Sequence, residues 1–311
     1  MSNLSAPHFH DEQAAYAFVE ARIWPEGPIC PHCGGVDRNA PMKGKTTRIG
    51  TYKCYDCRKP FTVKVGTIFE ASNVKMTVWL QAIYLMAASK KGISPHQLHR
   101  TLGVALRTAW FMSYRIREAM REGDLPPFGI DGGAVEVDET FIGNDRTIKP
   151  KGEKKGRDYH HKHKILALVD RNTGRARTIV IDSLAAKDIA PILRDNIAKE
   201  AHLMTDEASY YTLVGREFAA HGVVRHNQGE YGRGDVTTNT IEDFFSMFKR
   251  GMKGVYQHCG KKHLHRYAAE FEFRYNHRIA NGYNDLARAD QLLNGFVGKR
   301  LKYQDSFAAP A

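Results

Sequence analysis

The segment AVEVDETFIG (134–143) opens the part of the sequence that decides the fold, and two further apolar segments follow it, KILALVD (164–170) and RARTIVID (175–182). All three are rich in β-branched and apolar residues, and the turn RNTG joins the last two, so we expect three strands. The next segments alternate between helical and strand patterns: AAKDIAPILRDNI (185–197), HLMTD (202–206), SYYTLVGREFAAH (209–221), GVVRHN (222–227) and TIEDFFSMFKRGMKGVY (240–256). The order predicts an α/β domain with a mixed sheet and flanking helices.

Three of these predicted elements each carry a carboxylate that could reach a common site. Asp138 lies in the middle of the first strand, Asp206 ends a later strand, and Glu242 opens the last helix, with thirty-five residues between Asp206 and Glu242. Phosphodiester cleavage can use two divalent cations about 4 Å apart, and Mg²⁺ prefers oxygen ligands. We therefore predict that Asp138, Asp206 and Glu242 are catalytic and bind two Mg²⁺ ions.

Other acidic residues adjoin each member of this set. Glu136 shares a strand face with Asp138 by the period of two, whereas Glu139 points to the other face. Glu207 adjoins Asp206, and Asp243 adjoins Glu242. These four residues remain alternatives, and His226 and Asn239 are candidates for groups that support the site.

The helix that carries Glu242 also carries basic residues. At 100° per residue, Glu242, Lys249 and Lys253 project within about 20° of one another. A separate apolar stripe would be buried: Ile241, Phe245, Phe248 and Met252. We predict that DNA phosphates bind to this helix and to the basic segment 146–164, through Lys249, Arg250, Lys253, Lys154 and Lys155.

Four cysteines near the N-terminus form two CxxC pairs, Cys30 with Cys33 and Cys54 with Cys57, with twenty residues between the pairs. Two such turns close the tetrahedral shell that Zn²⁺ prefers. We predict one structural Zn²⁺ in a zinc ribbon. The alternative, two redox-active pairs, lacks a thioredoxin-like context, and reduced thiols favour a cytoplasmic location.

Three helical segments follow the cysteines: VKMTVWLQAIYLMAAS (74–89), SPHQLHRTL (94–102) and ALRTAWFMSYRIREAMRE (105–122). A helix, a glycine-bearing turn and a second helix are typical of a helix-turn-helix, so we predict that Arg107 and Arg115 contact DNA. An ordinary helical hairpin is the alternative.

The predicted domains follow from these patterns. We expect an N-terminal helix with the zinc ribbon over 1–69, a helix-turn-helix-like domain over 70–125, and a tail over 303–311. The region 126–302 is predicted to be catalytic, and its element order is that of a ribonuclease-H-like sheet.

The charge of the chain favours a polyanionic partner. Forty-six Lys and Arg residues against thirty-four Asp and Glu residues give a net charge of +12 in 311 residues. Lysine and arginine bind phosphates with release of counterions, which favours nucleic acid. No apolar run approaches the length of a membrane span and the N-terminus is unlike a signal peptide, so we expect a cytoplasmic, nucleoid-associated protein.

The chain resembles the DDE transposases of bacterial insertion sequences, in the group with an N-terminal zinc ribbon and a ribonuclease-H-like, integrase-like core. The resemblance covers residues 9 to 300 and rests on the motifs RIWPEGPICPHCGG, VEVDETFIG, TDEASYY, TNTIEDFFSMFKRGMKGVY and KKHLHRYAAEFEFRYNHR. It implies that Asp138, Asp206 and Glu242 are the catalytic triad and that magnesium is required.

The resemblance also implies the substrate and the reaction. The substrate would be double-stranded DNA, both the terminal inverted repeats of an element and a target. Water would cleave at an element end, and the freed 3′-hydroxyl would then attack target DNA. Two ends must be handled together, so we expect a homodimer or a larger assembly. The alternatives are a non-catalytic, domesticated DNA-binding regulator and a hydrolytic nuclease of the same fold.

Overall fold

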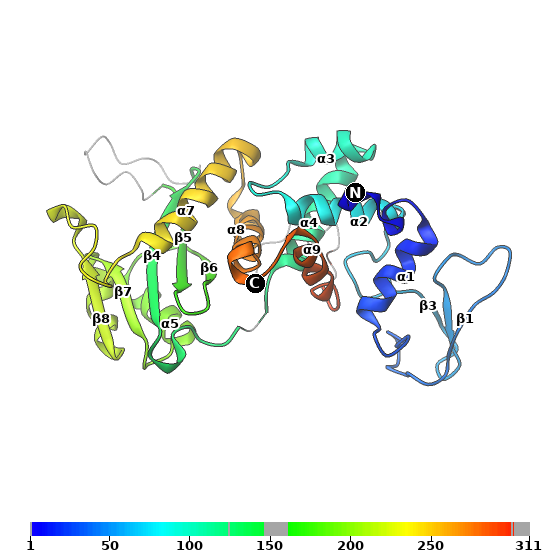
Figure 1. The fold of residues 1–311 in the computed structure, drawn as a ribbon, viewed down its shortest axis with the longest axis horizontal. Helices are drawn as coiled ribbons and strands as arrows, with labels where there is room; N and C mark the ends of the chain where they lie inside the picture. Colours follow the sequence, from blue (N-terminus) through cyan, green and yellow to red (C-terminus); the bar gives the residue numbers. More distant parts are fainter. Residues whose placement is uncertain (1, 124, 146–160, 300, 302–311) are drawn as a thin grey trace. The chain divides into compact units, whose positions relative to one another are not determined.

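The computed structural model describes residues 2–123, 125–145, 161–299 and 301. The chain divides into two compact units (Figure 1). The first comprises Met1–Arg121 together with Tyr283–Ala311, and the second comprises Glu122–Gly282. The predicted segment 1–69 and the predicted segment 70–125 as far as Arg121 therefore belong to one unit. The predicted tail, 303–311, lies outside the described residues.

The first unit consists of helices and a small three-stranded sheet. Its helices in the described residues are α1 (Glu12–Ile23), α2 (Met76–Ala88), α3 (Pro95–Leu102), α4 (Leu106–Met120) and α9 (Asp285–Asn294). Its strands are β1 (Asn39–Pro41), β2 (Tyr52–Cys54) and β3 (Pro60–Phe61), paired in the order β1-β2-β3. Short 3-10 turns, Asn3–Ser5 and Pro7–Phe9, precede α1.

Capping residues fix the helix ends where the sequence places them. Asp11 precedes α1 and accepts a hydrogen bond from the Ala14 N–H at 2.7 Å. Ser94 caps α3 in the same way, and α3 ends at Gly103, whose φ of 65° suits a residue without a Cβ. The helix α9 was not predicted. It packs against α2, so the chain from Tyr283 onward belongs to the first compact unit.

The prediction that Arg115 contacts DNA is wrong for this structure. The Arg115 side chain is 4% exposed, and its guanidinium donates to the carbonyl oxygens of Ile68, Glu70 and Leu301. A guanidinium has five donors, and here they hold loop backbone inside the first unit. Arg107, by contrast, is exposed near the start of α4, beyond the turn at Gly103.

The second unit contains a five-stranded mixed sheet flanked by helices. Its strands are β4 (Ala134–Ile142), β5 (His163–Asp170), β6 (Arg175–Ile181), β7 (His202–Asp206) and β8 (Ala220–Val224). The order is β6-β5-β4-β7-β8, antiparallel from β6 to β4 and parallel from β4 to β8. Its helices are α5 (Ala186–Asn196), α6 (Ser209–Thr212), α7 (Asn239–Gly251) and α8 (Lys261–Asn276). This confirms the predicted ribonuclease-H-like α/β fold.

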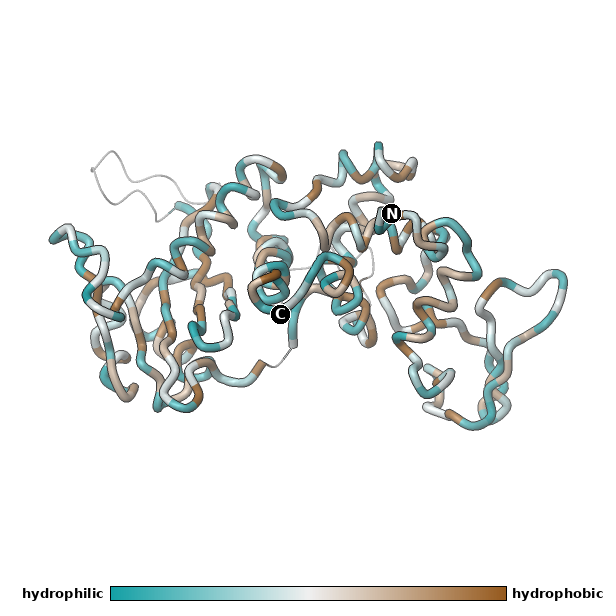
Figure 2. The backbone as a smooth tube through the Cα atoms, viewed as in Figure 1, coloured by the Kyte–Doolittle hydropathy of each residue, from teal (hydrophilic) through white to brown (hydrophobic). Residues whose placement is uncertain are grey.

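The two faces of the sheet are covered by different helices. Val135 and Val137 of β4 join Ile189 and Leu193 of α5 in a hydrophobic core that also includes Tyr211 of α6. The helices α7 and α8 pack on the strands from the other side, α7 against β4 and β5, α8 against β6. Figure 2 shows hydrophobic residues recurring along the strands of this unit. Residues 135, 137 and 139 of β4 therefore face α5 and α6, and residues 136, 138 and 140 face α7.

Two predicted helices differ in the structure. The segment 209–221 is helical only at Ser209–Thr212, continues as a 3-10 turn at Val214–Glu217, and then joins β8. A Cβ on Gly215 would lie 2.0 Å from the His221 ring, so this turn needs glycine. Pairing of Ala220–Val224 with β7 overrides the helical pattern.

The other difference concerns the last predicted helix. The α-helix α7 ends at Gly251, and Met252–Tyr256 form a π-helical turn. The stripe Ile241, Phe245, Phe248 and Met252 is buried as predicted. Lys253 lies beyond the α-helix, so the predicted angular match with Glu242 does not apply to it.

No helix in the described ranges is both long and apolar enough to cross a membrane.

Candidate active site and zinc ribbon

The four predicted zinc ligands converge in the first unit. The Sγ atoms of Cys30, Cys33, Cys54 and Cys57 all lie within 4.8 Å of one another. Cys30 and Cys57 are 3.7 Å apart and Cys33 and Cys54 are 3.6 Å apart, measured between sulfur atoms. Four thiolates around a tetrahedral zinc with bonds of about 2.3 Å have sulfurs roughly 3.8 Å apart. The cluster therefore fits a structural Zn²⁺.

Hydrogen bonds lower the pKa of one of these thiols. Burial raises the pKa of Cys30, but hydrogen bonds from the His32 and Cys33 N–H groups and from the Cys33 and Cys57 thiols together lower it to about 7. Around the cluster, Phe61 is buried, and Trp24 and Tyr52 pack against it. These aromatic side chains form a small core that the metal would complete.

Asp138 and Asp206 lie on neighbouring parallel strands of the second unit. Val135 of β4 pairs with Leu203 of β7, and Glu136 pairs with Met204. Continuing this register by two residues brings Asp138 level with Asp206, with both side chains on the face covered by α7. Asp138 accepts from the Glu139 N–H at 2.7 Å, and Asp206 accepts from the Ala208 N–H at 3.0 Å.

Glu242 comes to the same face from the first turn of α7. Its carboxylate is 49% exposed and accepts a hydrogen bond from the Thr238 hydroxyl at 3.2 Å. The Nε2 atom of His226 lies 3.6 Å from the same Glu242 oxygen, and His226 also acts electrostatically on Asp206. His226 therefore interacts with both acids, and Asn239 is exposed at the start of α7.

The three carboxylates repel one another. Burial raises the pKa of Asp138 to about 8, and the charges of Glu139, Asp206 and Glu242 add to this effect. Burial likewise raises the pKa of Asp206. A buried carboxyl among like charges is stabilised by a nearby cation. Oxygen donors from β4, β7 and α7 are the donor set that Mg²⁺ prefers, so the residues present fit this ion.

These acids are not closely clustered. In the part of the chain that the structure describes, the four cysteines form the one group of three or more Cys, His, Asp or Glu side chains whose ligand atoms all lie within 4.8 Å. Asp138, Asp206 and Glu242 share one end of one sheet face and interact through charge, but with wider spacing. Hydrated ions bridging such ligands are common for Mg²⁺.

The acidic neighbours have other partners. Glu136 is fully buried, forms an ion pair with Arg171 at 2.5 Å, and accepts from the Ile241 N–H at 2.8 Å. Glu139 faces α6, as the period of two predicts, and accepts from the hydroxyls of Tyr210 and Tyr211. Glu207 and Asp243 adjoin Asp206 and Glu242; Glu207 accepts from the Asn227 N–H at 3.1 Å, and Asp243 is exposed.

A basic cavity lies farther along β4 and α7. Its volume is about 870 Å³. The cationic side chains lining it are Lys162, Lys249, Lys253 and Lys261. It begins beyond Asp138 on β4 and beyond Glu242 on α7, roughly 10 Å along each element. Arg250 is exposed on α7 but does not line the cavity. The predicted DNA-binding residues Lys154 and Lys155 lie outside the described residues.

Sequence reasoning missed Arg171 and the two tyrosines. Arg171 was assigned only to the turn RNTG, although an arginine directly after a buried strand, with a glutamate on the neighbouring strand, is a signal of a buried ion pair. Tyr210 and Tyr211 were assigned to a helix without a role. Their hydroxyls hold Glu139 on the opposite face from Asp138.

Comparison with known proteins gives two matching domain families. Residues 131–276 match the model of the ISXO2-like transposase domain, and residues 10–60 match the transposase zinc-ribbon domain. A protein of Halobacterium salinarum, described as an uncharacterized protein in transposable element ISH50, is 26% identical over 275 residues. That alignment spans 85% of this chain and 90% of the relative.

A solved structure is also similar at low level. It is a chain of the simian T-cell lymphotropic virus intasome in complex with PP2A regulatory subunit B56 gamma, with 11% identity and a TM-score of 0.28. The alignment covers 63% of this chain and 65% of that chain. A likeness of that size does not establish a shared arrangement.

Proposed function

This chain belongs to the insertion-sequence transposases that carry an N-terminal zinc ribbon, and we propose on that basis that it cleaves DNA at element ends and joins those ends to target DNA, with Mg²⁺ as cofactor. The observation that carries the proposal is the level placement of Asp138 and Asp206 on adjacent parallel strands, with Glu242 entering the same face from α7. A DNA-processing activity follows from the family; the cleavage and strand-transfer chemistry is the proposal.

In this proposal the three acids would hold two Mg²⁺ ions. The ions would activate an attacking oxygen and stabilise the leaving oxyanion. Asp138 and Asp206 are fixed by backbone N–H groups, so they can hold their cations with little rearrangement. His226 and Thr238 orient the Glu242 carboxylate, which is the most exposed of the three.

The basic cavity would bind the DNA backbone. Lys249 and Lys253 follow Glu242 along the same helical segment, and with Lys162 and Lys261 they give the cavity lining four cationic side chains, of which Lys261 is paired with Asp182. A DNA strand whose scissile phosphate lies at the acids would place neighbouring phosphates along this wall. Arg250, Lys154 and Lys155 remain candidates for further phosphate contacts.

The first unit would add DNA contacts. Arg107 near the start of α4, after the α3 turn, occupies the position from which a helix-turn-helix reads the major groove. The zinc ribbon would support this unit or bind DNA itself. Two element ends must be joined in one reaction, so a homodimer or larger assembly on DNA is part of the proposal.

The test uses purified full-length protein, Mg²⁺ and a labelled duplex that carries an inverted repeat from the DNA flanking the gene. Joined products support the proposal. Cleavage without joining indicates a hydrolytic nuclease, and binding without cleavage indicates a DNA-binding regulator. Asp138→Asn is expected to lose cleavage by at least about a hundredfold and to keep DNA binding. Full activity of this variant contradicts the assigned site.

A further inference from the structure

A buried ion pair connects the two elements that carry Asp138 and Glu242. Glu136 lies two residues before Asp138 on the same face of β4, and none of its side chain is exposed. One Glu136 oxygen accepts from Arg171 Nε at 2.5 Å, and the other accepts from the Ile241 N–H at 2.8 Å. Both oxygens are therefore engaged, and one of them binds the residue next to Glu242.

Glu136 performs the capping role at the start of α7. An N-cap side chain ordinarily accepts from one of the first backbone N–H groups of its helix. At α7 the N-cap residue is Thr238, but its side chain makes no such bond and instead donates to Glu242. A carboxylate from β4 takes its place, and negative charge at a helix N-terminus is favourable.

Arg171 fixes the loop that leads into the same helix. Its Nη1 atom donates to the Asp235 carbonyl at 2.6 Å, and its Nη2 atom donates to the Thr237 carbonyl at 2.9 Å and to the Thr237 hydroxyl. One guanidinium thus joins Glu136 on β4 to Asp235 and Thr237, within the three residues before Thr238. The planar fork of arginine supplies these directions together, which a lysine ammonium does not.

We propose that Glu136 and Arg171 are positioning residues for the acidic centre: together they hold the start of α7 so that Glu242 faces Asp138 and Asp206. The inference rests on the proposed function, because the quantity it sets is the affinity of the acids for Mg²⁺. Glu136 is not a metal ligand in this account, since both its oxygens have partners. Groups that orient metal ligands typically change metal affinity about tenfold or more when altered.

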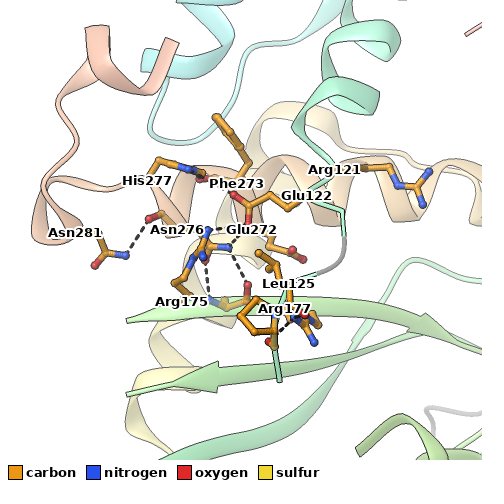
Figure 3. Close-up of polar contacts among 12 residues, drawn as sticks. Arg121, Glu122, Leu125, Arg175, Arg177, Glu272, Phe273, Asn276, His277 and Asn281 are labelled. Carbon is orange, nitrogen blue, oxygen red and sulfur yellow. Dashed lines mark hydrogen bonds and ion pairs between the residues drawn. The ribbon is translucent and has the colours of Figure 1, made fainter. Parts of the chain in front are cut away.

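The test compares Glu136→Gln and Arg171→Lys with a matched control, Glu272→Gln. Glu272 is also a buried glutamate on a covering helix, α8 (Figure 3). It accepts from the Thr178 N–H at 2.7 Å and from the Thr178 hydroxyl at 2.6 Å. It binds β6 rather than the start of α7. A loss of general stability should therefore affect all three variants, whereas a loss of positioning should affect only the first two.

Three quantities are measured on full-length protein: the rise in melting temperature with added Mg²⁺, hydrogen exchange of the Ile241 amide, and the Mg²⁺ concentration that gives half-maximal cleavage. In Glu136→Gln and Arg171→Lys we expect the Mg²⁺ midpoints to rise about tenfold, with cleavage recovering at saturating Mg²⁺. The Ile241 amide should exchange faster in Glu136→Gln. Glu272→Gln should keep the wild-type midpoints.

Each outcome bears on one of two statements. A wild-type response to Mg²⁺ with unchanged midpoints in both variants overturns the positioning role alone, as does an equal shift in Glu272→Gln. A wild-type protein that neither cleaves nor responds to Mg²⁺ overturns the proposed function and the inference with it. If Glu136→Gln does not fold, Arg171→Lys decides, because it keeps the positive charge beside Glu136.

Discussion

The cysteine cluster of the first unit and the acidic residues of the second unit are built differently. The four thiols lie within 4.8 Å of one another, with only Cys54 in a strand, and aromatic side chains pack around the cluster. The three carboxylates are spread over β4, β7 and α7, and a large hydrophobic core beneath the sheet supports the two strands. Protonated thiols are neutral and can touch, whereas carboxylates at 4 Å repel by roughly 4 kcal/mol near a protein surface.

The two sites therefore contribute differently to the stability of the units that carry them. The ribbon has few buried apolar residues, so binding of a metal by its four cysteines would supply most of its folding free energy. In the acidic centre, burial and neighbouring charges raise the pKa of Asp138, so the ionised form of this carboxyl is disfavoured in the folded unit. Other residues, Glu136 and Arg171 among them, hold the acids in place.

Removal of zinc or of one thiol should have the largest effect. For Cys54→Ser, or after chelation, we expect loss of metal-dependent folding free energy on the order of 10 kcal/mol in the ribbon, with the second unit intact. Zinc content and limited proteolysis around residues 30–61 measure this. The control is Cys259→Ser, which lies outside the cluster and should keep about one zinc per chain. If residues 30–61 of the metal-free chain resist proteolysis, the ribbon does not depend on zinc for its stability.

A buried arginine should matter less than the metal but more than any surface charge. Arg115→Ala removes the donor to three backbone carbonyls, so we expect a loss of about 3 kcal/mol in the free energy of unfolding of the first unit. Arg107→Ala, on the exposed part of the same helix, should leave stability within about 0.5 kcal/mol and weaken DNA binding. Denaturant titration and a binding assay distinguish the two residues. Equal stability of both variants would contradict the structural role of Arg115.

Substitution of Asp138 should stabilise the second unit, whereas substitution of a cysteine should destabilise the ribbon. Because burial and like charges raise the pKa of Asp138 to about 8, the folded chain keeps a proton that the unfolded chain releases near pH 4. The contribution of Asp138 to stability therefore falls as pH rises from about 4 to about 8. We expect Asp138→Asn to remove that dependence and to stabilise the second unit at about pH 8 by roughly 2 kcal/mol. Melting curves across this range check the sign, and destabilisation would overturn it.

The smallest effect concerns the basic cavity. Lys253→Ala should weaken DNA binding uniformly across sequences and lower the slope of log affinity against log salt by about 1. Lys187→Ala is the matched control, since Lys187 is equally exposed but lies on α5, which covers the opposite face of the sheet. If Lys253→Ala and Lys187→Ala give the same slope of log affinity against log salt, Lys253 and the cavity do not contact DNA phosphates.

Local patterns predicted much of the fold. Apolar and β-branched segments predicted the strands in their order along the chain. The helix ends at Asp11, Ser94 and Gly103 are likewise local features, because capping depends on nearby residues. The helix predicted over 209–221 failed after Thr212, since pairing with β7 decided the conformation of Ala220–Val224. The helix α9 was missed because its partner, α2, lies about 200 residues away in sequence.

For the candidate site, the sequence supplied residue types and the structure supplied their partners. The spacing of the CxxC pairs determined the thiol cluster, because a tetrahedral metal shell tolerates few other arrangements. The strand positions also placed Asp138 and Glu139 on opposite faces. Only the tertiary structure decided that Arg115 donates to buried carbonyls and that Glu136 caps α7. Periodicity tells which face a side chain occupies, but a hydrogen bond joins atoms that only folding brings together.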